Sequence, residues 1–414
     1  MDRVGKRFLR LSALGAALTA NGLRPATGAN PLAIPSFFAA WLTKELAPQN
    51  LMLTTATSAA YVASKRGRLT KTDKLALGLN ALSVAGLAVM LRQSMQSRGI
   101  VETALADELG ADYLTHLDAP PTESDLVTPW KTVLKPWDTK EPRVRKIADI
   151  DYVGDGKFRH KLDIYVPQAG GTNLPVVIQV HGGAWIVSQK DQQGIPLMNH
   201  LSARDFVCVA VNYPLSPKAK WPEHLVALKQ AVAWTKANIA EYGGDPSFIT
   251  VTGGSAGGHL AAMLALTAND PAFQPGFEDV DTSLQACVPF YGVYDIANTL
   301  NTRAGKQRLD WFMKSMFFGG RDVDKYNSAT ALLHVDADAP PFFVIHGTHD
   351  SLVPVVEARE LVSKLRDVSK EAVVYAELPG TEHGFDVFHS VRGAHVIRGV
   401  ERFLRFVHAG YLER

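Results

Sequence analysis

The stretch that decides the fold is Phe248-Ile-Thr-Val-Thr-Gly-Gly-Ser-Ala-Gly-Gly-His-Leu-Ala-Ala-Met-Leu-Ala-Leu266. Its β-branched start predicts a strand, and its Ala- and Leu-rich end predicts a helix. Between them stands Gly-x-Ser-x-Gly, where flanking glycines leave room for a serine held on a sharp turn. Free amides at the start of the helix stabilise negative charge that develops beside this serine. We therefore interpret Ser255 as a nucleophile; the alternative is a Gly-rich structural turn.

A second strand–turn motif lies upstream. Leu174-Pro-Val-Val-Ile-Gln-Val180 is an apolar run of the buried-strand type, and it ends in His181-Gly-Gly-Ala-Trp185. Glycines after a strand let the backbone turn its amides into an open cavity, as a developing oxyanion requires. An ordinary Gly-Gly turn is the alternative, and the presence of Ser255 downstream argues against it.

A serine nucleophile needs a base and an acid that orients the base. Asp350 follows the predicted strand Pro341–His346 and precedes a helix that begins near Pro354. Asp295 also follows a strand and is the rival, but it comes one strand too early. His383 stands on a Gly-flanked loop from which it can reach a distant serine. The order Ser255, Asp350, His383 is that of α/β-hydrolases.

Five motifs together resemble the hormone-sensitive-lipase-like carboxylesterases and the related feruloyl-esterase and kynurenine-formamidase branches of the α/β-hydrolase superfamily. They are His181-Gly-Gly-Ala-Trp185, Asn212-Tyr-Pro-Leu-Ser216, Gly253-Gly-Ser-Ala-Gly257, His346-Gly-Thr-His-Asp350 with Val353-Pro354, and His383-Gly-Phe385. The resemblance covers residues 143–410. It implies that the amides of Gly183, Ala184 and Ala256 hold the oxyanion. Ala184 departs from the third glycine of many relatives, but it keeps the backbone amide.

The expected activity is hydrolysis of short- to medium-chain carboxylic esters through an acyl-enzyme, with no cofactor or metal. An amidase of the kynurenine-formamidase type is the alternative, because it shares the His-Gly-Gly-x-Trp motif. An inactive membrane scaffold is a second alternative, although every triad position is filled.

Strands and helices alternate from Arg143 onward, which predicts a mostly parallel eight-stranded sheet with helices on both faces. The expected strands lie near 144–152, 159–166, 174–180, 206–212, 247–252, 284–290, 341–346 and 372–378. Residues 292–340 are too many for a plain crossover. The aromatic stripe within them is either core or a lid; as a lid it presents Trp311, Phe312 and Phe317, with Trp185, to the substrate.

The N-terminal third, residues 1–98, is basic and apolar. It holds thirteen Lys and Arg against three acids, a net charge of +10 that leaves −8 for the rest of the chain. Its start resembles a signal peptide, with an amphipathic surface helix as the alternative. Lys44, Glu45 and Pro48 interrupt the apolar run 35–63, whereas 75–91 carries no charge. We expect contact with membrane lipid, with a buried helical hairpin in a cytoplasmic enzyme as the alternative.

The composition of the chain argues against several other classes of protein. The two cysteines, Cys208 and Cys287, lie in predicted buried strands, and no metal-ligand spacing exists. The basic residues flank apolar stretches and do not alternate with aromatics on a polar face, so nucleic acid is a poor partner. Residues 99–142, rich in acids and prolines, form a connecting segment before the catalytic domain at 143–414.

Overall fold

The computed structural model describes residues 3–27 and 32–413, and its centre is one eight-stranded sheet. The strand order is β1-β2-β4-β3-β5-β6-β7-β8, with β2 antiparallel to both of its neighbours and the remaining pairs parallel. The predicted α/β-hydrolase architecture is confirmed. The strands are β1 (Val144–Asp151), β2 (Lys161–Pro167), β3 (Leu174–Val180), β4 (Val207–Val211), β5 (Gly244–Gly254), β6 (Ala286–Phe290), β7 (Phe342–Gly347) and β8 (Val373–Leu378).

Helices bury both faces of this sheet, as parallel strands require. On one face, α8 (Glu223–Asn238), α9 (Ala256–Leu266) and α12 (Val356–Val368) share a hydrophobic core with the strands. On the other face, α7 (Ile195–Ser202) and α13 (Val391–Leu412) form the second core. Both cysteines are free and buried in these cores, as predicted.

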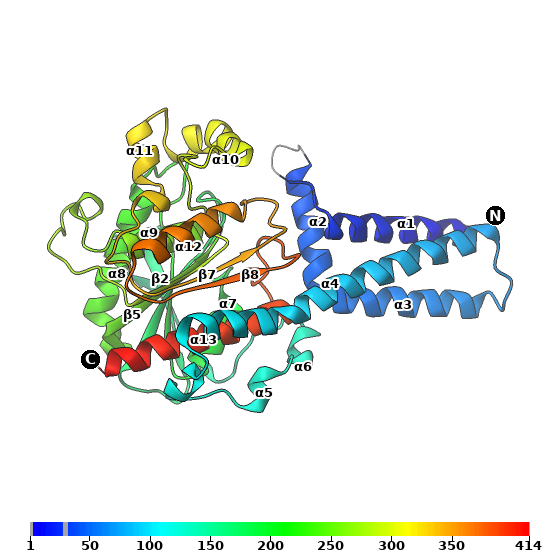
Figure 1. Ribbon diagram of the computed structural model, residues 1–414, viewed down its shortest axis with the longest axis horizontal. Coiled ribbons are helices and arrows are strands. Elements are labelled where there is room, and N and C mark those ends of the chain that lie inside the picture. The colour runs from blue at the N-terminus through cyan, green and yellow to red at the C-terminus, as the bar shows by residue number, and fades with distance from the viewer. Residues whose placement is uncertain (1–2, 28–31, 414) are drawn as a thin grey trace.

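Four helices make up the N-terminal region: α1 (Arg3–Leu23), α2 (Ala33–Glu45), α3 (Ala47–Ser64) and α4 (Lys71–Leu109). Figure 1 shows α1, α3 and the first half of α4 side by side, projecting away from the catalytic domain. Helix α2 crosses their inner end and lies against the domain. The charged residues that interrupt the apolar run in the sequence stand where α2 ends and α3 begins.

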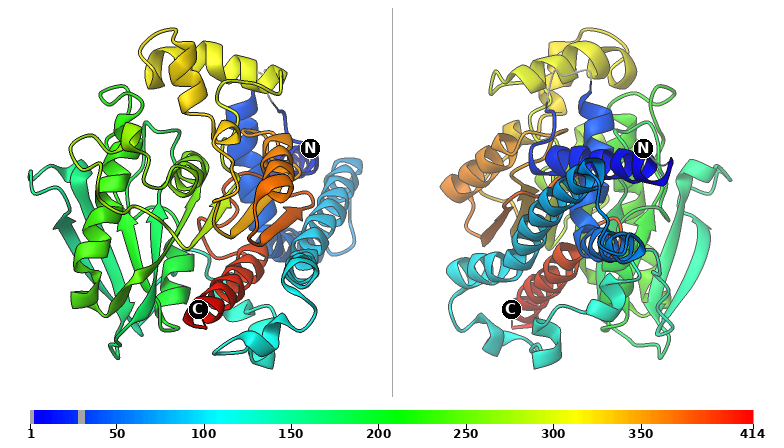
Figure 2. Two further views of the ribbon diagram at one scale, coloured as in Figure 1. Left: turned by 60° about the vertical axis from the view of Figure 1, so that its left-hand side comes forward. Right: turned by 90° about the vertical axis from the view of Figure 1, so that its right-hand side faces the viewer.

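Helix α4 joins the two parts of the molecule. It continues beyond residue 98, and its second half lies beside α13 on one face of the sheet (Figure 2). There Val101 and Leu105 enter the second core, and Glu108 Oε1 accepts a 2.9 Å hydrogen bond from the amide of Val373 at the start of β8. The short helices α5 (Glu123–Leu126) and α6 (Trp130–Val133) then lead to β1.

Candidate active site

The turn between β5 and α9 holds Ser255 in a strained conformation. Its φ of 61° and ψ of −122° lie outside the regions that ordinary residues adopt, a strain that proteins retain mainly at functional sites. The neighbouring glycines are required by close backbone contacts. A Cβ at Gly257 would lie 2.2 Å from the carbonyl oxygen of Val180, and one at Gly253 would lie 2.5 Å from that of Gly257. The sequence therefore folds into the sharp turn that the Gly-x-Ser-x-Gly spacing predicts.

Asp350 and His383 are brought together from the ends of β7 and β8. His383 Nδ1 lies 2.7 Å from Asp350 Oδ2, which leaves Nε2 as the ring nitrogen for a substrate proton. The other carboxylate oxygen of Asp350 accepts hydrogen bonds from the amides of Leu352 and Val353, at 2.9 and 2.7 Å. His346 Nε2 lies 3.2 Å from Oδ2, so two imidazoles share this oxygen. Both oxygens of the Asp350 carboxylate are thus held by protein groups.

These contacts set the ionisation of the pair. Burial alone would lower the pKa of His383, but the Asp350 carboxylate and its hydrogen bond raise it above the ordinary value. Burial would raise the pKa of Asp350, yet His383 and the hydrogen bond from His346 hold it well below its usual range. The acid is therefore ionised at neutral pH and strengthens the histidine as a base.

Tyr291 lies close to His383 and to Gly254, the residue before Ser255. The Tyr291 ring lies 4.5 Å from the His383 ring, and a Cβ at Gly254 would lie 2.7 Å from the Tyr291 hydroxyl. Among residues 3–27 and 32–413 no hydrogen bond joins Ser255 Oγ to His383. Such bonds often tighten only when substrate is bound.

The loop after β3 has an unusual backbone. Gly183, Ala184 and Trp185 all have positive φ, at 99°, 51° and 60°. A Cβ at Gly183 would lie 2.3 Å from the Val187 carbonyl oxygen, so glycine is needed there, whereas alanine is accommodated at 184. Within the described part of the chain, no hydrogen bond uses the amides of Gly183, Ala184 or Ala256. These three donors are unused by the fold, as an oxyanion site requires.

The rival acid has a different position. The carboxylate of Asp295 accepts hydrogen bonds from the amides of Thr299 and Leu300, at 2.7 and 2.9 Å, and holds a local turn. The structure does not bring it to His383.

The predicted substrate-binding aromatics separate into two groups. Trp185 and Phe317 are buried, with ring centroids 4.9 Å apart, and the Trp185 N–H donates to His259 Nδ1. Phe312 is half-buried against the same core. Trp311, on the segment η5 (Leu309–Phe317), is 88% exposed, and the structure does not bring it to the others. The aromatic stripe is thus largely part of the hydrophobic core, and Trp311 alone among the three predicted aromatics of this stripe faces solvent.

Several residues around His383 were not singled out from the sequence. Glu382 Oε1 accepts hydrogen bonds from the amide of His383 and, at 2.9 Å, from the hydroxyl of Ser351, so it links the loop after β8 to the loop after β7. The Tyr291 hydroxyl donates to Asp386. The sequence signal that could have identified Glu382 is its position next to His383, because carboxylates beside a candidate base often shift its pKa.

Several known proteins are similar to this chain in sequence or in fold. The family model BD-FAE matches residues 162–365. The chain is 40% identical over 97% of its length to the probable carboxylic ester hydrolase LipM of Mycobacterium tuberculosis, of which it covers 93%. It is 41% identical to esterase LipQ of the same organism, over 75% of this chain and 74% of LipQ. A truncated carbohydrate esterase from gut microbiota shares the fold, with a TM-score of 0.55 and 22% identity over 65% of this chain and 99% of that one.

The fold and the elbow serine define an α/β-hydrolase. The chain belongs, with these relatives, to the hormone-sensitive-lipase-like carboxylic ester hydrolases of that superfamily.

Proposed function

We propose that this carboxylic ester hydrolase works through an acyl-enzyme on Ser255, with His383 as the base and Asp350 as its orienting acid. The observation that carries the proposal is the 2.7 Å contact between His383 Nδ1 and the buried Asp350 carboxylate. It fixes the imidazole tautomer that leaves Nε2 able to accept the serine proton. The preferred substrates are esters with short to medium acyl chains.

The reaction follows from the geometry. Ser255 Oγ attacks the ester carbonyl while its proton passes to His383 Nε2. The amides of Gly183, Ala184 and Ala256 hold the oxyanion of the tetrahedral intermediate. The imidazolium then gives its proton to the departing alcohol, which leaves an acyl-Ser255. Water repeats the sequence, its proton going to His383, and releases the carboxylic acid.

The serine is tested by Ser255→Ala, which should lower the turnover of a chromogenic short-chain aryl ester by about 10⁴- to 10⁶-fold. Ser247→Ala, an exposed serine on the same strand, is the matched control and should behave as wild type. An aryl alkylphosphonate should label the wild type on Ser255, as seen by peptide mass, and leave Ser255→Ala unlabelled. Activity above a tenth of wild type in Ser255→Ala would exclude this nucleophile. Faster turnover of N-formylkynurenine than of aryl esters would favour the amidase alternative.

We also propose that the projecting helices anchor the enzyme in a membrane. We call residues 11–23 of α1, 47–64 of α3 and 75–91 of α4 the outer bundle, and none of these segments carries a charge. At 1.5 Å per residue they are roughly 20–27 Å long, close to the hydrocarbon thickness of a bilayer. Helix α4 has the length and composition of a spanning helix. Large apolar side chains on all three segments are exposed, among them Leu14, Leu53 and Leu82.

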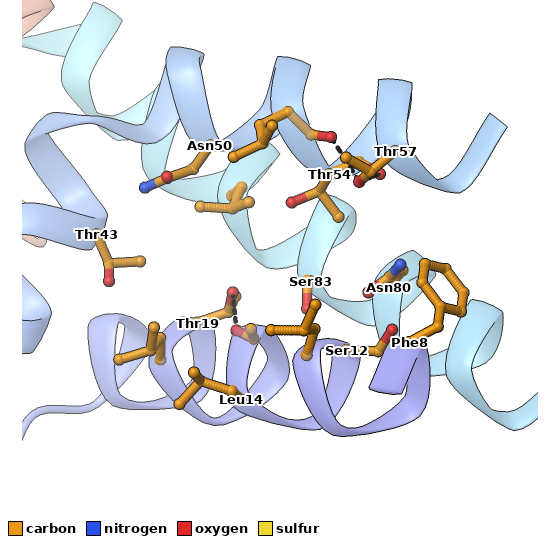
Figure 3. A pocket seen from close by; sticks show the side chains of 15 residues that line it. Phe8, Ser12, Leu14, Thr19, Thr43, Asn50, Thr54, Thr57, Asn80 and Ser83 are labelled. Atoms are coloured by element: carbon orange, nitrogen blue, oxygen red, sulfur yellow. Dashed lines mark hydrogen bonds between the residues drawn. The ribbon is translucent and has the colours of Figure 1, made fainter. Parts of the chain in front are cut away.

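The packing inside the outer bundle supports a lipid environment. A Cβ at Gly86 would lie 2.5 Å from Thr19, and one at Gly22 would lie 2.6 Å from Met90, so α1 and α4 approach closely through glycine. Asn80 Nδ2 donates to Ser58 Oγ at 2.8 Å, which links α4 to α3. Small residues and interhelical polar bonds are typical of helix contacts in membranes. Between α1 and α3 a largely apolar groove of about 350 Å³ stays open (Figure 3), and lipid chains would fill it.

Charge supports one orientation. Phe8 of α1 stacks on Tyr61 of α3 at 3.7 Å, so the start of α1 and the loop between α3 and α4 lie together at the far end of the bundle. We call the residues there the basic tip: Arg3, Lys6, Arg7, Arg10, Lys65, Arg66, Arg68, Lys71 and Lys74. Basic segments remain on the cytoplasmic side of spanning helices. We therefore propose that the tip is cytoplasmic and the catalytic domain lies on the opposite face.

Two experiments test the anchor and its orientation. Burial in lipid predicts that the full chain stays with membranes in about 1 M salt and leaves them in detergent, because salt at that strength screens purely ionic attachment. A membrane-impermeant maleimide added to intact cells should label Lys370→Cys on the catalytic domain but not Lys71→Cys at the tip; both positions are exposed. A monodisperse species without detergent would exclude the anchor, and the reverse labelling pattern would exclude the orientation.

A further inference from the structure

Helix α2 belongs to the N-terminal region, yet its inner face lies on the loop that carries His383. The indole N–H of Trp41 donates a 2.8 Å hydrogen bond to the carbonyl oxygen of Gly384, the residue after the histidine. The Trp41 ring also packs on Phe388, at 5.3 Å. Phe37, one turn earlier, meets the His383 ring edge-on at 6.0 Å. Gly384 has a φ of 72°, which glycine adopts without strain, and the freedom of a glycine backbone means that this external hydrogen bond helps to fix the loop.

Lys44, three residues after Trp41 on α2, has unusual surroundings. Its side chain is 2% exposed, and within residues 3–27 and 32–413 no partner lies at hydrogen-bond distance from Nζ. The ammonium interacts electrostatically with Glu382 and Asp350, which flank His383 in the fold, although burial lowers the pKa of Lys44 to about 8. Glu382 Oε2 is likewise buried without a hydrogen-bond partner among the described residues. A buried ammonium without a hydrogen bond costs stability, so the fold alone gives no reason to retain it.

The charge balance around the histidine gives such a reason. Among the carboxylates that raise the pKa of His383, Asp350 has the largest effect and Glu382 the next, and Asp386 acts in the same direction. A cation on α2 offsets part of that effect, so the imidazole stays neutral at a lower pH than it otherwise would. The other groups facing this site are His346 and His349 after β7, Asp386 beyond the histidine, Tyr291 after β6, and Glu45 with Arg392 at the base of α2.

We propose that Trp41 and Lys44 are positioning residues of the active site: Trp41 fixes the loop of His383 through Gly384, and Lys44 balances the charge of Asp350 and Glu382. The N-terminal region is thus a component of the catalytic apparatus as well as an anchor. The inference rests on the proposed roles of Ser255, His383 and Asp350, and Ser255→Ala tests those roles separately.

Trp41→Phe tests the loop contact, because it keeps an aromatic ring and removes the donor. We expect kcat for the short-chain aryl ester to fall about 10- to 100-fold with KM changed less than threefold, since a displaced base slows chemistry more than binding. Trp137→Phe is the matched control: its ring also packs on Phe388, at 4.4 Å, but lies on the surface, and it should keep wild-type kcat. A wild-type kcat in Trp41→Phe would overturn this half of the proposal.

Lys44→Met tests the charge. Loss of the cation should raise the midpoint of the acid limb of the kcat/KM–pH profile by about one unit, and Lys44→Arg should restore it. The melting temperature of Lys44→Met should equal or exceed that of the wild type, a result that a merely structural lysine would not give. Lys229→Met is the matched control. That buried lysine bonds to Thr267, Gln274 and Thr282 away from the triad, so its loss should lower the melting temperature and leave the midpoint unchanged.

An unchanged midpoint in Lys44→Met, or a lower melting temperature without a pH effect, would overturn the role of Lys44. Should Lys44→Met fail to fold, the neutral variant Lys44→Gln replaces it, and an unchanged midpoint in that variant would overturn the role of Lys44. If the role of Trp41 or Lys44 is overturned in one of these ways, a Ser255→Ala variant without activity would still support the proposed function. The two proposals can therefore fail separately.

Discussion

Helix α2 and the outer bundle have similar apolar sequences, but their surroundings in the fold differ. The outer bundle projects from the domain with leucines such as Leu53 and Leu82 exposed. Helix α2 instead buries Lys44 and Glu45 against the domain, where Lys44 interacts electrostatically with Asp350 and Glu382. Hydropathy therefore does not distinguish helices that project from the domain from a helix that packs against its loops. Lys44 and Glu45, the charged residues that interrupt the apolar run, lie where the chain passes from α2 to α3 of the outer bundle.

If α2 and the outer bundle differ in this way, substitutions in the loops of Asp350 and His383, in α2 and in the outer bundle should have effects of decreasing size on hydrolysis or stability. The largest is expected for Asp350→Asn. An amide at this position favours the wrong imidazole tautomer, so kcat should fall by about 10³- to 10⁴-fold. Asp295→Asn is the matched control, because that carboxylate holds a turn and makes no contact with His383. Steady-state kinetics of the two variants decide between the acids, and the reverse ranking would reassign the triad.

The second effect concerns the C-terminal end of α2. The Glu45 carboxylate pairs with the guanidinium of Arg392 at the start of α13, and both side chains are buried. Glu45→Gln leaves the Arg392 charge unpaired in the interior, which costs about 3–5 kcal/mol of unfolding free energy. Denaturant unfolding should show this loss. Asn80→Ala, which removes a hydrogen bond inside the outer bundle, should cost far less. Equal effects would mean that α2 is no better integrated than the bundle.

The third effect is a pH shift. In the proposed mechanism the reaction requires neutral His383, and the Asp350 carboxylate raises the pKa of this imidazole above its ordinary value of 6.5. The kcat/KM of the wild type should therefore rise with pH through a midpoint above 6.5. In Asp350→Asn the residual activity should show a midpoint at least about one unit lower, because the stabilising negative charge is gone. A midpoint that does not respond would assign the limb to another group.

The comparison also shows what a sequence can and cannot predict. The strand, elbow and helix at 248–266 are local: β-branched residues, glycines and helix formers each act within a few positions. The pairing of Asp350 with His383 is long-range, yet it follows from the strand order of the fold. The bond from Trp41 to Gly384 joins residues 343 positions apart, and no periodicity or motif indicates it. Lys44 and Glu45 were visible as interruptions, but their partners, Asp350, Glu382 and Arg392, depend on the packing of α2.

The smallest effect on chemistry is expected in the outer bundle. Leu53→Asp and Leu82→Asp replace side chains that are exposed on α3 and α4, so the core loses no contact and kcat for a water-soluble ester should stay within twofold of wild type. A carboxylate in the hydrocarbon region costs about 2.5–3.5 kcal/mol, so the membrane-bound fraction of the double variant should fall. Leu333→Asp, at an exposed leucine of the catalytic domain, is the matched control and should partition as wild type. Sedimentation with membranes followed by an ester assay of both fractions measures the two quantities together. A double variant that stays bound would show that lipid does not cover these faces, and one that loses activity while folded would show that the bundle also acts on the active site.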